Sequence, residues 1–150
     1  LCDTGLDHHS GNIHEHQKKT MTLDSVRKMV KKNVQLTFET RNHLLRGDLN
    51  KFGACLDAAW QLKRRFSSKI SSDYIDSIYN GALEHAATGG KLLGAGGGGF
   101  FIFYVSPFKK HALITYLETQ NLKLQPFRFE PDGLKTWVSR DYSNSPTNAE

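Results

Sequence analysis

The stretch GGKLLGAGGGGF, Gly89 to Phe100, decides how the rest of the sequence is interpreted. It holds seven of the 13 glycines in a chain of 150 residues. Glycine weakens helices and strands, so such a cluster indicates positive φ angles or a backbone that another group approaches closely. The aromatic run from Phe100 to Val105 follows at once and predicts a short, largely buried strand directly after the glycines.

Three amphipathic helices are predicted before the glycines, because apolar residues recur three or four positions apart. The first begins with a Thr22 cap, ends at Gly47 and carries its apolar stripe at Leu23, Val26, Val30, Val34, Phe38, Leu44 and Leu45. The second runs from an Asp48 cap to about Phe66, and the third from Ser71 or Ser72 to a stop at Gly89-Gly90.

After the buried strand, Pro107 begins a fourth helix, with Ala112, Leu113, Tyr116 and Leu117 on its apolar face. Two further strands are predicted, about Lys123 to Phe129 and Leu134 to Ser139, joined by a Pro131-Asp132-Gly133 turn. The order predicts an α+β fold in which helices cover one face of an antiparallel sheet. Residues 1–140 are expected to form one domain, and the polar residues 141–150 a disordered tail.

Composition favours a globular protein with anionic partners. Hydrophobic residues make up 38% and charged residues 23%, the net charge is +5, and the pI is about 9.3. There is no apolar run near the ~20 residues of a membrane helix and no secretory signal, so the protein is predicted to be cytoplasmic, without a membrane partner. The opening Leu1-Cys2-Asp3 resembles the inside of a strand, which suggests a piece of a longer chain.

Cysteines and histidines give no sign of a metal site. Cys2 and Cys55 lack metal or redox spacing; two free thiols are predicted, and one disulfide stays open. His8, His9, His14 and His16 have no carboxylate partner at ligand spacing and are interpreted as surface residues. The basic clusters Arg27-Lys28, Lys31-Lys32 and Lys63-Arg64-Arg65 are interpreted as solvated helix faces.

Familiar glycine motifs do not fit the cluster. Gly94, Gly96 and Gly99 match GxGxxG, but a dinucleotide-binding site needs a helix after the glycines, and here a strand follows. Gly90-Lys91 continues into Leu92, which excludes a Walker A motif, and no Val-Ala-Ile-Lys strand follows as in protein kinases.

One other motif does fit. Residues Lys91 to Gly99 resemble the third motif of the galactokinase, homoserine kinase, mevalonate kinase and phosphomevalonate kinase superfamily, which lies in its C-terminal domain between two strands. The Thr4-Gly5 pair with Ser10, and the stretch from Pro126 to Lys135, resemble the heptose 7-phosphate kinase branch. The resemblance covers roughly Leu1 to Arg140. That branch usually has an arginine where this chain has His8-His9, and histidine holds a phosphate only when protonated.

The resemblance implies a ferredoxin-like C-terminal domain of an ATP-dependent sugar kinase that phosphorylates heptose 7-phosphate at its anomeric hydroxyl for surface polysaccharide synthesis. ATP and Mg²⁺ would be bound mainly by an N-terminal domain, which also carries the phosphate loop and catalytic aspartate of the superfamily. The fragment alone is then expected to be inactive. Expected partners are a phosphorylated sugar and that N-terminal domain, with a homodimer left open.

The candidate site residues are predicted to bind phosphate or substrate, and no catalytic residue is predicted in this chain. They are Thr4, His8, Ser10, Lys91, Gly94, Ala95, Gly96, Gly97, Gly98 and Gly99. Closely spaced backbone N–H groups form an anion-binding concavity, and glycine allows them to turn inward. Lys91 would either add positive charge or be a solvated strand residue. Thr4, His8, His9 and Ser10 would either line the sugar side or form a surface turn that caps a helix, and Arg128 and Lys135 are weaker candidates for a sugar phosphate.

Two other functions stay open. A domain with the same residues could bind phosphorylated sugars without chemistry. An RNA-binding domain would use the aromatic residues of the strand after Gly99 to stack on bases, although Gly98 and Phe101 depart from that motif, so nucleic acid is not the expected partner.

Overall fold

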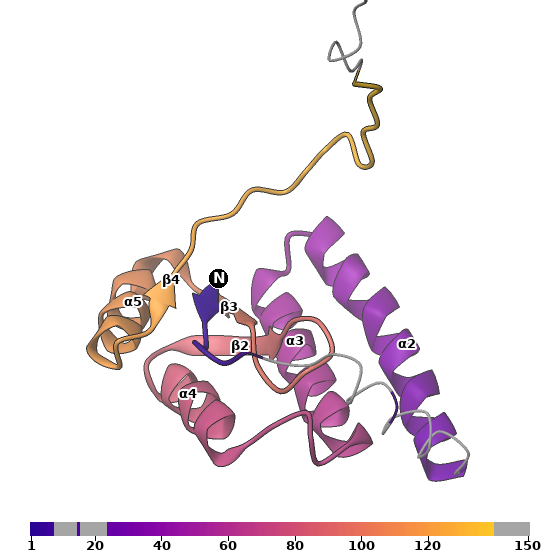
Figure 1. Cartoon of the computed structure of the whole chain (residues 1–150), viewed down its shortest axis with the longest axis horizontal. Helices are drawn as coiled ribbons and strands as arrows, with labels where there is room; N and C mark the ends of the chain where they lie inside the picture. Colours follow the sequence, from indigo (N-terminus) through magenta and orange to yellow (C-terminus); the bar gives the residue numbers. More distant parts are fainter. Residues whose placement is uncertain (8–14, 16–23, 140–150) are drawn as a thin grey trace, which may run out of the picture.

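The computed structural model describes residues 1–7, 15 and 24–139, in which a small sheet of short strands lies among the helices (Figure 1). In chain order the elements are β1 (Cys2–Asp3), α2 (Asp24–Leu45), α3 (Leu49–Lys63), η1 (Arg64–Phe66), α4 (Asp73–Glu84), β2 (Ala87–Leu92), β3 (Phe100–Val105), η2 (Pro107–Lys109), α5 (Lys110–Thr119) and β4 (Lys123–Leu124). Residues 141–150 and the Thr22 cap lie outside the described residues. The α+β prediction is confirmed.

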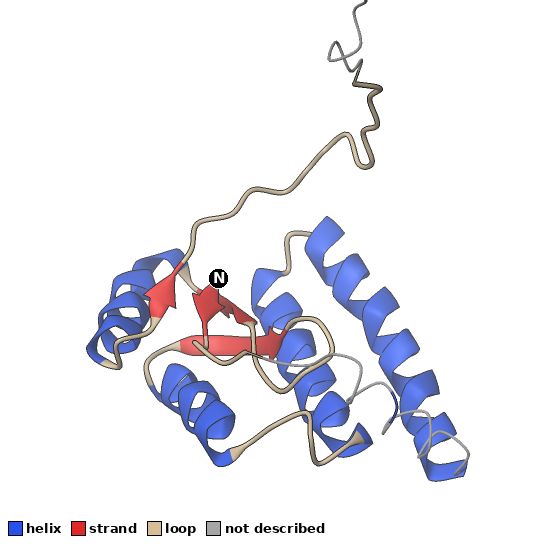
Figure 2. Cartoon of the chain, viewed as in Figure 1, coloured by secondary structure: helices blue, strands red, loops and turns tan. Residues whose placement is uncertain are grey.

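Four strands form one antiparallel sheet in the order β2-β3-β1-β4 (Figure 2). β1 comes first in the chain and lies between β3 and β4. The Leu1 amine donates to the carbonyl of Gln125 (3.0 Å), and the Gln125 amide donates back to the Leu1 carbonyl (2.9 Å). The position of β1 beside β3 brings Thr4, just after β1, to the end of the glycine segment.

An aromatic core joins the helices to the sheet. Trp60 of α3, Tyr79 of α4 and Phe101 of β3 are fully buried, with ring centroids 5.6 to 5.9 Å apart. Leu113 and Leu117 of α5 belong to the same cluster. Burial of a large apolar side chain contributes about 1.5–3 kcal/mol. The core therefore holds α3 and α4 firmly against the two strands that flank the glycine loop.

Gly89 and Gly90 lie inside β2, so the prediction that they stop the third helix is wrong. α4 ends at Glu84, and the chain reverses through Ala86, whose φ is +83°. A Cβ atom on Gly89 would lie 2.1 Å from the carbonyl oxygen of Gly53 in α3. Glycine is needed here because a helix backbone packs directly on the strand.

Helix α2 packs against α3 on the outer side of the molecule (Figure 1). Val26 and Leu36 are its buried apolar residues, whereas Val34 and Phe38 of the predicted stripe are exposed. Residues four apart on a helix drift by about 40° around its axis. The predicted stripe advances by four residues at a time from Val26 to Phe38, so its later members rotate away from α3. The prediction that these residues form one buried face is therefore wrong for Val34 and Phe38.

The predicted closing hairpin does not form. β4 covers Lys123–Leu124, and the described chain from 126 to 139 has no strand and extends away from the sheet (Figure 1). Its turn is present at Gly133, with φ +70°. Leu134 and Val138 are 92% and 94% exposed. An isolated two-stranded hairpin is marginal without an apolar surface to cover it, and no described residue supplies one here.

Both cysteines are free thiols, as predicted. Cys2 is buried beside the aromatic core, and this burial raises the pKa of its thiol to about 11. A thiol with such a pKa stays protonated near neutral pH, so Cys2 acts as a core residue.

Candidate functional site

The glycine loop, residues 93–99, joins β2 to β3, two neighbouring antiparallel strands. Gly94, Gly96, Gly97 and Gly99 have φ angles of +68°, +120°, +76° and +91°. A Cβ atom on Gly98 would lie 2.6 Å from the carbonyl oxygen of Leu6. Positive φ angles and this close approach explain why the sequence concentrates glycine here.

The loop is held by residues from distant parts of the chain. The amide and hydroxyl of Thr4 both donate to the carbonyl of Gly99, at 2.9 and 2.8 Å. The amide of Gly97 donates to the carbonyl of Ile70 (2.9 Å). The amide of Leu93 donates to the Phe100 carbonyl (2.9 Å) and closes the base of the loop. The loop is thus a fixed structure and not an open connection.

Several amides of this fixed loop have no hydrogen-bond acceptor among the described residues. They are those of Gly94, Ala95, Gly96, Gly98 and Gly99. Ala95, Gly96 and Gly98 are buried residues. Buried backbone N–H groups are nearly always paired in folded proteins, because an unpaired one costs about 1–3 kcal/mol. Such a group of donors is suited to an anion, whose oxygens accept several hydrogen bonds at once.

Lys63 at the end of α3 is part of this site, and the sequence interpretation missed it. Its ammonium group donates to the carbonyls of Leu92 (3.1 Å) and Gly94 (2.5 Å), and the residue is 9% exposed. Burial, and secondly the charge of Lys91, lower the pKa of Lys63 to about 8. The interpretation of this basic cluster as a solvated face is therefore wrong for Lys63.

A signal for Lys63 was present in the sequence. It lies four residues after Ala59 and three after Trp60, on the buried side of the same helix. Its neighbour Arg64 is also engaged, since it pairs with Asp76 and lies 6.0 Å from the ring of Trp60. Helical periodicity predicts that Lys63 is buried and that the residue at position 65 is exposed. Treating the three basic residues as one charged run hides this difference.

Of the other predicted site residues, the structure places Lys91 and Thr4 beside the glycine loop. Lys91 is half-buried on β2, paired in register with Ile102, and its charge acts on Lys63. Thr4 is 1% exposed, with its hydroxyl engaged by the loop and its carbonyl accepting from the Tyr74 hydroxyl (3.3 Å). The remaining candidates lie outside the described residues, as do two further histidines: His8, His9, Ser10, His14 and His16.

Arg128 and Lys135 are not brought to the loop. They lie in the extended segment that leaves the sheet at β4, the edge opposite β2. Lys135 pairs with Asp132 beside the turn. The structure therefore gives this segment no place in a site at the glycine loop.

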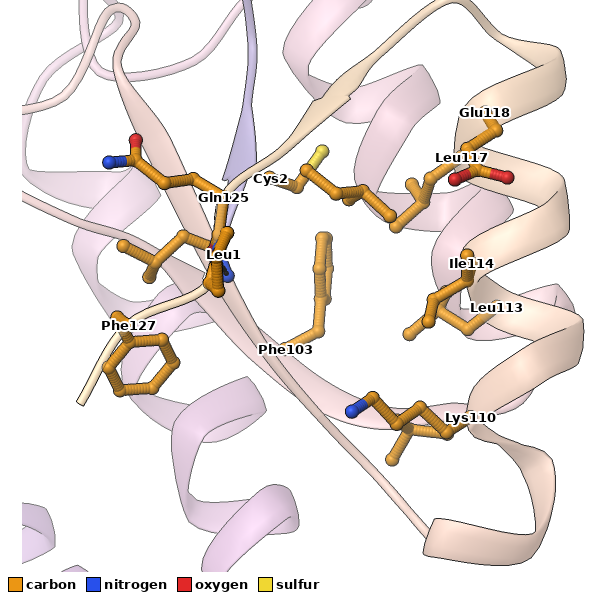
Figure 3. A pocket seen from close by; sticks show the side chains of 13 residues that line it. Leu1, Cys2, Phe103, Lys110, Leu113, Ile114, Leu117, Glu118, Gln125 and Phe127 are labelled. Carbon is orange, nitrogen blue, oxygen red and sulfur yellow. Dashed lines mark hydrogen bonds between the residues drawn. The ribbon is translucent and has the colours of Figure 1, made fainter.

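Two pockets formed by described residues lie away from the glycine loop. A cavity of about 520 Å³ lies between β3, α5 and the start of the extended segment, and Phe103, Lys110, Leu113 and Phe127 are among its lining residues (Figure 3). A second, of about 420 Å³, is lined by α3, α4 and the four serines between them. Residues 93–99 line neither of these two pockets.

The described residues also bear on metal binding, membrane spans and RNA binding. Within residues 1–7, 15 and 24–139, no group of three or more potential ligand side chains is placed to hold a metal ion. Among the described helices, none combines the length and apolar character needed to cross a membrane. Phe101 is fully buried against Trp60 and Tyr79, so this aromatic residue of β3 belongs to the core and is not available to stack on bases.

Comparison with known proteins gives consistent matches. The model of the family "GHMP kinases C terminal" matches residues 42–121. The chain is 31% identical over 137 residues to D-glycero-alpha-D-manno-heptose 7-phosphate kinase of Campylobacter jejuni, covering 91% of this chain and 40% of that protein. It is 23% identical over 94 residues to the bifunctional fucokinase/GDP-fucose pyrophosphorylase of Arabidopsis thaliana, covering 63% and 8%.

Among solved structures, the crystal structure of L. major mevalonate kinase in complex with R-mevalonate superposes with a TM-score of 0.71 at 22% identity. The match covers 79% of this chain and 37% of that one. This chain therefore spans less than half the length of the kinases it matches. The family match covers more than half of the chain and includes the glycine loop, so the chain belongs to the GHMP kinases and has the fold of their C-terminal domain.

Proposed function

We propose that this chain is the C-terminal half of an ATP-dependent sugar kinase that phosphorylates heptose 7-phosphate at its anomeric hydroxyl, for the synthesis of nucleotide-activated heptose and surface polysaccharide. The observation that carries the proposal is the fixed glycine loop, with unpartnered amides between two antiparallel strands of the described chain. The similarity to the Campylobacter jejuni heptose 7-phosphate kinase supports the substrate class.

In this reaction the sugar hydroxyl attacks the γ-phosphorus of ATP, and the bond to the ADP oxygen breaks. Catalysis of phosphoryl transfer consists mainly of positioning and charge stabilisation. Backbone amides suit this task because they are fixed dipoles that need no reorganisation when charge develops. The role proposed for residues 94–99 is to bind the transferring phosphate or the 7-phosphate of the sugar, with Lys91 adding positive charge.

The other components would come from outside the described residues. ATP and Mg²⁺ would be held mainly by an N-terminal domain that packs against the glycine loop. Because neither pocket of the described chain encloses the loop amides, we propose that this chain binds sugar phosphate weakly and has no kinase activity when alone. A cytoplasmic location is part of the proposal, since the reaction consumes ATP.

The test is a kinase assay of the complete polypeptide with ATP, Mg²⁺ and a panel of acceptors: heptose 7-phosphate, the heptose without phosphate, fucose and mevalonate. We expect ADP release with heptose 7-phosphate and a new anomeric phosphate in the ³¹P spectrum. Transfer to fucose or mevalonate at a higher kcat/KM would refute the substrate assignment.

A second arm uses the 150-residue chain under the same conditions. We expect no ADP release, because the nucleotide-binding part is missing. Phosphorylation of any sugar by this chain alone would contradict the assignment of the catalytic groups to another domain.

Binding of sugar phosphate without turnover by the complete polypeptide would instead indicate a non-catalytic sugar-phosphate-binding protein.

A further inference from the structure

We propose that Lys63 is the positioning residue of the glycine loop: it fixes the peptide plane that turns the Ala95 amide toward the phosphate, and it supplies a buried positive charge that the bound phosphate balances. The inference rests on the proposed function of the loop as an anion site. It adds a residue outside the glycine motif, at the C-terminal end of α3.

The first step is geometric. Lys63 Nζ donates to the carbonyl of Gly94 (2.5 Å), and the N–H of Ala95 belongs to the same peptide unit. In a planar trans peptide the C=O and N–H bonds point in opposite directions. Holding the Gly94 carbonyl toward α3 therefore turns the Ala95 amide away from α3, and this amide has no acceptor among the described residues.

The second step concerns charge. Lys63 is 9% exposed, and its ammonium group contacts the carbonyls of Leu92 and Gly94; within the described residues no carboxylate pairs with it. A buried charge without a counter-ion is costly. Lys91 of β2 adds a second positive charge. An anion bound at the loop would offset both charges.

The charged groups on the elements around Lys63 determine how pH acts on it. From β2, Lys91 is the charge that acts on Lys63. On α3 itself, Asp57 accepts from the Tyr79 hydroxyl; Asp76 of α4 is already in an ion pair, and the loop carries no titratable side chain. The pKa of Lys63 is lowered to about 8. A bound anion favours the protonated form, so binding near pH 8.5 should take up protons, and affinity should fall as the pH rises above 8.

The experiment is calorimetric titration of the complete polypeptide with sulfate at pH 8.5, in two buffers of different ionisation enthalpy. Sulfate does not titrate in this range, so proton uptake reports on the protein. The variants are Lys63→Met, which removes the charge and both hydrogen bonds, and Lys63→Arg, which stays protonated. Lys51→Met is the matched control, since Lys51 is an exposed lysine on the same helix.

We expect proton uptake in the unmodified protein and in Lys51→Met, and none in Lys63→Met or Lys63→Arg. Lys63→Met should bind sulfate about tenfold to a hundredfold more weakly, because it loses the charge that balances the anion and the charge-assisted hydrogen bond that orients the Ala95 amide. Lys63→Arg should retain more affinity than Lys63→Met. If Lys63→Met does not fold, the inference is tested by comparing proton uptake in Lys63→Arg with proton uptake in the unmodified protein.

Unchanged affinity in folded Lys63→Met, or sulfate binding without proton uptake in the unmodified protein, would overturn the inference. Failure of the proposed function is distinguishable from this result. If the expected differences appear but heptose 7-phosphate is not phosphorylated, only the substrate assignment fails. If the unmodified protein binds no sulfate, the loop is not an anion site and the inference fails with it.

Discussion

The glycine loop and the extended segment 126–139 were both predicted from turn-forming residues, but only the loop is held in place. The loop is fixed by Thr4, Lys63 and Ile70, which come from separate parts of the chain. The extended segment has its turn at Gly133, but Phe129 beside it is 80% exposed. The comparison shows that a turn motif fixes local direction, whereas a stable position requires contacts from distant residues.

The largest expected effect comes from Gly98→Ala, with Gly133→Ala as its matched control. A Cβ atom at position 98 meets the Leu6 carbonyl oxygen at 2.6 Å, whereas at position 133 nothing lies within 4 Å. Because the loop must shift, we expect Gly98→Ala to lower kcat/KM of the complete polypeptide about a hundredfold. A kinase assay checks this.

Gly133→Ala should change kcat/KM by less than about threefold, because a strained turn in an exposed segment disturbs no distant contact. Equal effects of the two variants would show that the loop and the segment do not differ in the way proposed.

Removing one anchor of the loop should have a smaller effect. Thr4→Val deletes the hydroxyl that donates to the Gly99 carbonyl but retains nearly the same volume. Loss of a buried hydrogen bond costs about 1–2 kcal/mol, so unfolding in urea should require correspondingly less denaturant. Thr4→Ser keeps the hydroxyl and should stay closer to the unmodified protein. Identical midpoints for Thr4→Val and the unmodified protein would show that this anchor is dispensable.

Lys63 makes a pH-dependent contribution to stability. Its folded pKa of about 8 lies below the value of 10.5 for an unfolded lysine. Between these values the unfolded chain binds more protons, so the stability of the unmodified protein relative to Lys63→Met should rise as the pH rises. We expect a gain on the order of 1 kcal/mol between about pH 7.5 and 9.5 in urea unfolding. A difference that is flat or falls with pH would contradict the burial of this ammonium group.

Much of the fold could be predicted from local sequence patterns. The aromatic run from Phe100 predicted β3, and Pro107 predicted the start of the helical segment after it. The glycine motif identified the family because its residue types are required by the loop backbone itself. These features depend on neighbours in sequence, and local patterns record them well.

The remainder depended on contacts between distant residues. Gly89 and Gly90 belong to a strand on which α3 packs, which no local pattern records. The part played by Thr4 depends on the position of β1 beside β3. Lys63 was grouped with its charged neighbours, although its side chain is the one of the three that reaches the loop carbonyls. In each case the missing information was which surfaces meet.

The smallest effect is expected at Trp137. The chain has two tryptophans, Trp60 and Trp137, which are 0% and 84% exposed. In the 150-residue chain, Trp137→Ala should change the free energy of unfolding by less than about 0.5 kcal/mol, because an exposed side chain makes few contacts that the substitution removes. It should also remove the fluorescence that iodide quenches, while Trp60 stays protected. If iodide fails to reach Trp137 in the complete polypeptide, the segment has gained there the packing surface that it lacks in this chain. Protection of Trp137 in the 150-residue chain itself would contradict the contrast with the loop.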